Sequence, residues 1–178
     1  AFEMYKQNRP MFTSDRLLAI AKQVNAHYIV MSDYPNCDAS KTITAAEELA
    51  PKFKDAGVGT FFCPQSKIGD LDSLCASFAW AAQSSLVDYI GVSILSVPNA
   101  YGVESNNKLQ RYLSRYAFMK ELEYRGIMDQ IKENEKLIHF LGMVDGPNEI
   151  ELMGYNGYDE CIDTWDSSAA VWYGLNGI

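Results

Sequence analysis

Paired cysteines and clustered histidines are absent from this 178-residue sequence. Its four cysteines are widely spaced with no C-x-x-C pair, and there are only two histidines. This spacing gives no zinc signature, and four scattered thiols fit a reducing compartment better than a disulfide framework. We therefore expect a cytoplasmic protein, and the residues themselves indicate no metal site.

Long apolar runs and excess positive charge are also missing. No stretch reaches the roughly 20 residues of a membrane-spanning helix, and no signal-peptide pattern opens the sequence, so we expect no membrane partner. The formal net charge is −8, which argues against a broad basic surface for nucleic acid but does not exclude a local basic groove. The sequence is 48% hydrophobic and 21% charged, as is typical of a globular domain with a substantial core.

Five short apolar runs recur along the chain, rich in Val, Ile, Phe and Tyr. Runs of this length and composition are typical of buried β-strands. The predicted strands are His27–Met31, Gly59–Cys63, Val87–Leu95, Leu137–Met143 and Glu160–Trp165.

Segments with apolar residues at helical spacing separate these runs. Helices are predicted over about 16–24, 42–53, 71–82 and 106–125, and a polar loop over 96–107. We expect the last helix to turn inward Leu109, Tyr112, Leu113, Tyr116 and Met119. Its basic residues Lys108, Arg111 and Arg115 are expected on a solvated face, with phosphate contacts as the alternative.

Alternating strands and helices predict an α/β fold with a parallel sheet and right-handed crossovers. Two architectures fit the residues, an open doubly wound sheet and part of an eight-stranded (β/α)8 barrel. A complete barrel takes about 250 residues, so five strands are an incomplete one. In both, reacting groups lie at the carboxyl ends of the strands.

Polar residues and a glycine occupy those strand ends. Asp33 follows the first run, Gln65 the second and Asp166 the fifth, while Gly91 lies within the third. The alternative for Asp166 is that it caps the next helix. His139 lies inside an apolar run, where a structural or orienting histidine is favoured over a catalytic base.

These groups suit a neutral heterocycle with donor and acceptor edges. A carboxylate accepts two N–H bonds from an amidine-like edge, an amide pairs with a ring carbonyl, and a second carboxylate is free to act as nucleophile. This combination points to a guanine-like base and to chemistry at its glycosidic carbon.

Five short motifs, in order, resemble those of the tRNA-guanine transglycosylase family, including its archaeosine and DNA-modifying relatives. They are Ile29-Val30-Met31-Ser32-Asp33, Pro64-Gln65-Ser66, Ile90-Gly91, Ile138-His139-Phe140-Leu141-Gly142 and Ile162-Asp163-Thr164-Trp165-Asp166-Ser167. The resemblance implies an incomplete TIM-type barrel, with residues 1–178 as one domain from its later part.

The resemblance also implies an activity. A guanine in tRNA or DNA would be exchanged for a 7-deazaguanine, with Asp166 rather than Asp163 as the nucleophile. Asp33, Gln65 and Gly91 would contact the base. The family's D-S-G-G-F-Q motif, which carries its acid/base aspartate, and its zinc cysteines have no counterpart here, so no cofactor is expected in this chain. A homo-oligomer is compatible with the resemblance.

Two other functions remain open at the level of sequence. One is a non-catalytic binding or assembly module of the same fold, favoured by the missing acid/base motif and the acidic charge. The other is an unrelated open-sheet α/β enzyme that uses Asp33 or Asp166 with a divalent ion.

Overall fold

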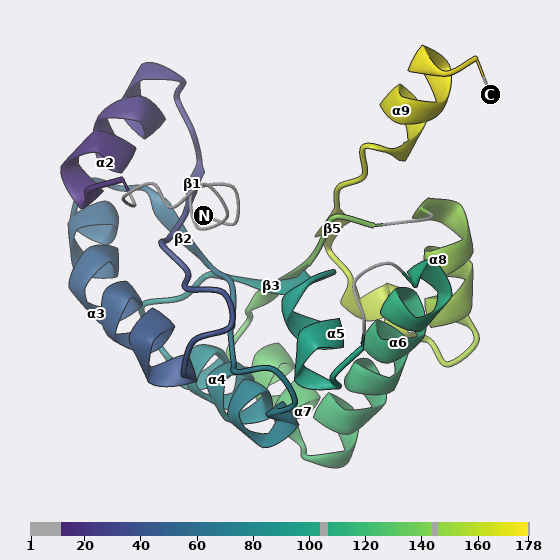
Figure 1. Ribbon diagram of the computed structural model, residues 1–178. Helices are drawn as coiled ribbons and strands as arrows, with labels where there is room; N and C mark the ends of the chain where they lie inside the picture. The colour runs from purple at the N-terminus through teal and green to yellow at the C-terminus, as the bar shows by residue number, and fades with distance from the viewer. Residues whose placement is uncertain (1–11, 104–106, 144–145, 178) are drawn as a thin grey trace.

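The five predicted strands form one parallel sheet in the computed structural model, which describes residues 12–103, 107–143 and 146–177 (Figure 1). Each strand pairs only with its neighbours in the chain, in the order β1-β2-β3-β4-β5, and every pairing is parallel. The strands are β1 (Tyr28–Val30), β2 (Gly59–Phe62), β3 (Tyr89–Ser93), β4 (Leu137–Leu141) and β5 (Thr164–Trp165).

One or more helices lie before, between and after the strands. These helices are α2 (Ser14–Gln23), α3 (Ala39–Asp55), α4 (Leu71–Gln83), α5 (Ser96–Ala100), α6 (Lys108–Tyr124), α7 (Ile127–Glu133), α8 (Gly146–Gly154), the 3-10 helix η1 (Tyr158–Cys161) and α9 (Ala169–Leu175). Polar N-cap side chains explain where several begin. Thr13, Asp38, Asp70 and Asn107 each accept a hydrogen bond from a backbone N–H in the first turn of their helix. No helix of the described residues is long and apolar enough to cross a bilayer.

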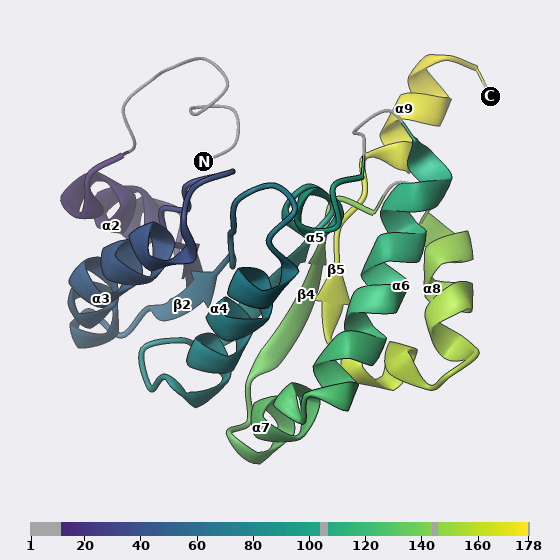
Figure 2. The same ribbon diagram turned by 60° about the horizontal axis from the view of Figure 1, so that its bottom comes forward.

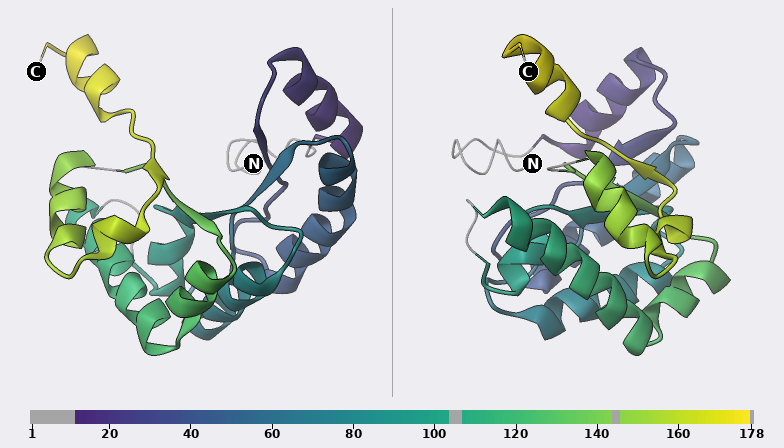
Figure 3. Two further views of the ribbon diagram at one scale, coloured as in Figure 1. Left: turned by 180° about the vertical axis from the view of Figure 1, so that it is seen from behind. Right: turned by 90° about the vertical axis from the view of Figure 1, so that its right-hand side faces the viewer.

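The sequential strand order separates the two architectures that the sequence left open. A doubly wound sheet reverses its strand order at a switch point, which places helices on both faces. Here the order never reverses, and the sheet bends into an arc with α3, α4, α6 and α7 along its outer side (Figures 1 and 3). The described part therefore has the winding of an incomplete parallel barrel. The α/β class with five parallel strands is confirmed.

The two faces of the sheet differ in what covers them. On the outer face, strand residues such as Phe62, Ile90 and Phe140 are completely buried beneath the helices. On the inner face, Tyr28 remains 44% exposed and Val30 49% exposed. Aromatic rings run across that inner face in contact with one another, with centroids 5.0 to 5.6 Å apart, in the order Tyr28, Tyr89, Phe61 and His139.

Helix α6 turns a different face inward from the one predicted. Met119 is buried as expected, but Leu109 and Leu113 are 53% and 41% exposed. The buried positions are Ser114, Arg115, Phe118, Met119 and Leu122. The prediction of a solvated Arg115 is therefore wrong, because this side chain lies in the buried stripe and has an ionic partner there.

The segment predicted as a polar loop over 96–107 begins with a short helix. Its first turn contains Pro98, which lacks an N–H group and is tolerated there because early N–H groups have no partner within a helix. This helix, α5, packs against α4, α6 and β3 at the carboxyl end of the sheet (Figure 2).

Candidate functional site

Three of the polar residues that the sequence singled out lie at one end of the sheet. Because all strands are parallel, the residues that follow them gather at the same edge. Asp33 follows β1, Gln65 follows β2, and Asp166 comes directly after β5. Gly142, which comes directly after β4, links Asp166 to the others, as described below.

Asp33 and Gln65 are in direct contact. The Gln65 Nε2 group donates to Asp33 Oδ2 at 2.6 Å, and the two residues are only 6% and 4% exposed. Burial raises the pKa of the Asp33 carboxyl, and the hydrogen bond from Gln65 offsets only part of that rise. A further N–H donor at this site would therefore stabilise the ionised form of the buried carboxyl.

The Asp33→Asn variant is expected to be more stable than the parent protein at neutral pH. Folding raises the pKa of Asp33. Its contribution to the free energy of unfolding is therefore present in full below its unfolded pKa and is lost as the pH rises through the folded pKa. Asparagine keeps the Gln65 contact without this loss. The melting temperatures should coincide near pH 4 and differ by about 2–4 °C at pH 8, the shift that about 1 kcal/mol gives at this chain length.

Thermal unfolding of both proteins across this pH range measures the effect. The Asp38→Asn variant is the control with the opposite slope, because hydrogen bonds from the Ser40 side chain and amide lower the pKa of Asp38. A difference between Asp33→Asn and the parent that stays constant with pH would contradict the raised pKa.

A cavity of about 230 Å³ adjoins this pair at the carboxyl ends of the strands. Asp33 and Ser93 supply polar groups to its wall, and the other side chains are apolar apart from a thiol. The lining residues are Val30, Asp33, Cys63, Ser93, Ile94, Leu95, Leu141 and Gly142. The volume is below the roughly 300–1,000 Å³ of typical ligand pockets, which suits a single planar base rather than a whole nucleotide.

The Asp166 carboxylate does not itself line this cavity, but it is held beside Gly142, which does, by the Gly142 N–H and the His139 side chain on β4. Its Oδ1 atom accepts from the backbone N–H of Gly142 at 2.9 Å and lies 3.0 Å from His139 Nε2. Its other oxygen, Oδ2, has no hydrogen-bond partner among the described residues. The side chain is 57% exposed, so one oxygen is fixed and the other is open to a reactant.

His139 orients Asp166. Because a carboxylate can only accept, Nε2 of His139 carries the proton of their shared hydrogen bond. Nδ1 lies 2.7 Å from the Thr164 hydroxyl, which donates to it when the imidazole is neutral. The structure thus supports the orienting histidine that the sequence favoured.

Asp163 and Asp166 have different surroundings despite their close spacing. Asp163 Oδ2 accepts from the Ile138 backbone N–H at 2.7 Å, near the start of β4. Asp166 lies beyond the carboxyl end of β5, and the following helix begins only at Ala169. Its carboxylate contacts His139 on β4 and Gly142 just after it, which argues against the alternative that it caps this helix.

Gly91 is not among the residues that line the cavity. Close packing around it explains why a glycine stands at this position. A Cβ atom at this position would lie 2.7 Å from both Leu141 Cδ1 and Phe61 Cε1. Only glycine therefore fits between those two side chains without a shift. The predicted contact between its backbone and a base stays a prediction.

Arg115 and Glu149 beneath the site were missed by sequence reasoning. Both side chains are completely buried, and Arg115 Nη2 lies 2.5 Å from Glu149 Oε1. The sequence pattern did indicate that Arg115 is buried, because it lies at i, i+3, i+4, i+7 spacing with Phe118, Met119 and Leu122.

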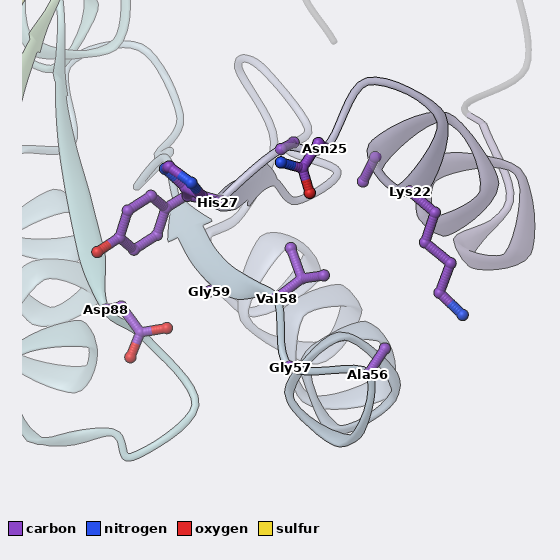
Figure 4. A pocket seen from close by; sticks show the side chains of 11 residues that line it. Lys22, Asn25, His27, Ala56, Gly57, Val58, Gly59 and Asp88 are labelled. Atoms are coloured by element: carbon purple, nitrogen blue, oxygen red, sulfur yellow. The ribbon is translucent and has the colours of Figure 1, made fainter.

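A larger cavity of about 540 Å³ lies at the opposite, amino-terminal end of β1 and β2 (Figure 4). Lys22, Asn25, His27 and Asp88 contribute polar side chains to it, and Asp88 is already bound by Lys54 at 2.7 Å. None of the site residues predicted from the sequence lines it. Within the described ranges, no three His, Cys, Asp or Glu side chains are grouped closely enough to hold a metal ion.

Comparison with known proteins gives no family to which the chain can be assigned. No protein-family model matches the sequence, and a search of curated proteins found no match.

Proposed function

We propose that this protein binds a guanine-like base at the carboxyl end of its sheet and exchanges it within a nucleic acid through a covalent bond to Asp166. One observation carries the proposal. The Asp166 carboxylate, with one free oxygen, is bound to Gly142, and Gly142 lines the same cavity as the buried Asp33.

The recognition step depends on Asp33 and Gln65. A guanine presents two adjacent N–H donors and a ring carbonyl on one edge. The donors match the Asp33 carboxylate, and the carbonyl matches the Gln65 amide. Leu141, Ile94 and Leu95 line the cavity, and their apolar side chains suit the flat faces of a ring.

The reaction step depends on Asp166. Its Oδ2 lone pair forms a bond to ribose C1′ as the C1′–N9 bond breaks, and the bonding electrons leave with the guanine, which takes up a proton. The incoming 7-deazaguanine gives up a proton, attacks C1′ and displaces Asp166, so the exchange has no net proton change. The fixed Oδ1 atom keeps the carboxylate oriented in both steps.

Base exchange tests the proposal directly. The protein is incubated with radiolabelled guanine and either tRNA or duplex DNA, and incorporation into the polymer is counted. A parallel sample with a 7-deazaguanine is quenched in denaturant and examined for a protein–nucleic acid adduct. Incorporation into one polymer together with an adduct supports the proposal and identifies the substrate.

Two outcomes contradict it. Guanine binding by calorimetry without incorporation or adduct would favour the non-catalytic binding module. A reaction that requires Mg²⁺ and forms no adduct would favour the metal-dependent alternative.

A further inference from the structure

The buried ion pair between α6 and α8 lies directly beneath the candidate nucleophile. Glu149 Oε1 is 2.6 Å from Arg115 Nε and 2.5 Å from Nη2, and both side chains are 0% exposed. The ring of Phe140, on β4, packs under the guanidinium, and its centroid lies 4.9 Å from Arg115 Cζ. These contacts hold the guanidinium in one place.

The third guanidinium nitrogen of Arg115, Nη1, reaches the carboxyl ends of two strands. Nη1 donates to the carbonyl of Val92 at 3.1 Å and to that of Leu141 at 2.9 Å. The Leu141 carbonyl belongs to the same planar peptide unit as the Gly142 N–H. That N–H donates to Asp166 Oδ1 at 2.9 Å. A single peptide therefore separates the guanidinium from the nucleophile.

We propose that Arg115 is a positioning residue for Asp166, acting through the Leu141–Gly142 peptide, which it fixes in orientation and polarises. The proposal rests on the proposed function only in assigning Asp166 its chemical role. A cation at the carbonyl end of a peptide draws electron density toward oxygen and makes its N–H a stronger donor, so hydrogen bonds in series strengthen one another.

Two further observations fit this role. The Leu141 carbonyl also accepts from Ile94 N at 3.1 Å, so donors from two directions set the plane of the peptide. Burial lowers the pKa of Arg115, while Glu149 and, more weakly, Asp166 raise it. Asp166 is thus within electrostatic reach of the guanidinium.

Stability alone does not require an ion pair at this position. Replacing a buried pair with apolar residues of similar volume is often neutral or stabilising, whereas removal of one partner is costly. The Arg115→Met/Glu149→Met double variant therefore removes the guanidinium without leaving a lone buried charge. The matched control is Arg125→Met/Glu121→Met. This pair is more exposed, with Glu121 on α6 and Arg125 directly after it, and its charged atoms are 2.7 Å apart.

The primary measurement is the NMR signal of the Gly142 amide, which does not depend on any activity. In the double variant we expect its proton to move upfield and to exchange faster with solvent. The kcat of base exchange should fall about tenfold, as for one weakened hydrogen bond, with the KM for the base unchanged. The control variant should leave the amide signal, kcat and KM unchanged.

An unchanged Gly142 amide in the folded double variant would overturn the proposal, whatever its activity. If the double variant does not unfold cooperatively, Arg115→Lys takes its place. That variant keeps a charge beside Glu149 but loses the planar fork that reaches the Leu141 carbonyl, and an unchanged amide there overturns the proposal equally. A shifted amide in a protein whose parent has no exchange activity would overturn the proposed function alone.

Discussion

The Asp166→Asn variant is expected to form no covalent adduct and to exchange bases at least about 10⁴-fold more slowly than the parent protein, as for loss of other enzymatic nucleophiles. The amide oxygen can still accept from the Gly142 N–H and from His139 Nε2, which lie 2.9 and 3.0 Å from Asp166 Oδ1. The local geometry is therefore retained, and the change removes the nucleophilic oxygen. Denaturing gels and incorporation of labelled base measure both effects.

Asp163→Asn is the matched control, three residues away in the same motif. Its carboxylate accepts from the Ile138 N–H at 2.7 Å, which an asparagine side-chain oxygen can also do. We expect this variant to retain both the adduct and the exchange rate to within a few-fold. An adduct that persists in Asp166→Asn, or one lost only in Asp163→Asn, would reject Asp166 as the nucleophile.

The Glu149→Leu variant is expected to lower the free energy of unfolding by about 3–5 kcal/mol, because it leaves the Arg115 charge buried without its ionic partner. For a chain of this size, the melting temperature should fall by about 6–20 °C. Urea unfolding followed by circular dichroism measures the free energy, and the same samples give the melting temperature. Adding Arg115→Met to this variant should restore most of the loss.

An exposed ion pair provides the comparison for this stability test. Lys52 Nζ lies 3.3 Å from Asp15 Oδ1, and these side chains are 56% and 83% exposed. The Asp15→Ala variant should change the free energy of unfolding by less than about 1 kcal/mol. Equal effects of Asp15→Ala and Glu149→Leu would show that burial does not set the cost of breaking the Arg115–Glu149 pair.

The strands could be predicted from the sequence because each is an apolar run between helical segments. All five lie within the predicted ranges, although β5 retains only Thr164–Trp165 of its predicted length. The helices α5, α7, α8 and α9 were not predicted. Each has 9 residues or fewer, too short for an apolar stripe to repeat clearly, and tertiary packing decides their conformation.

The site was predictable to the extent that strand ends mark it. Asp33 and Gln65 were predicted to act together, and they share a hydrogen bond of 2.6 Å. The buried role of Arg115 was not predicted, because charge alone favoured a solvated position. Its partner Glu149 is 34 residues away on another helix, and such a distant pairing has no local pattern in the sequence.

The hydrogen bond between Gln65 and Asp33 has a consequence for ligand selectivity. In the proposed function, a base competes with the glutamine amide for the lone pairs of Asp33 Oδ2. A guanine compensates with two donors of its own and a carbonyl that satisfies the displaced amide. An adenine lacks the donor on its ring nitrogen and would leave the buried aspartate with one hydrogen bond fewer, so the proposed function predicts that this internal bond disfavours adenine relative to guanine.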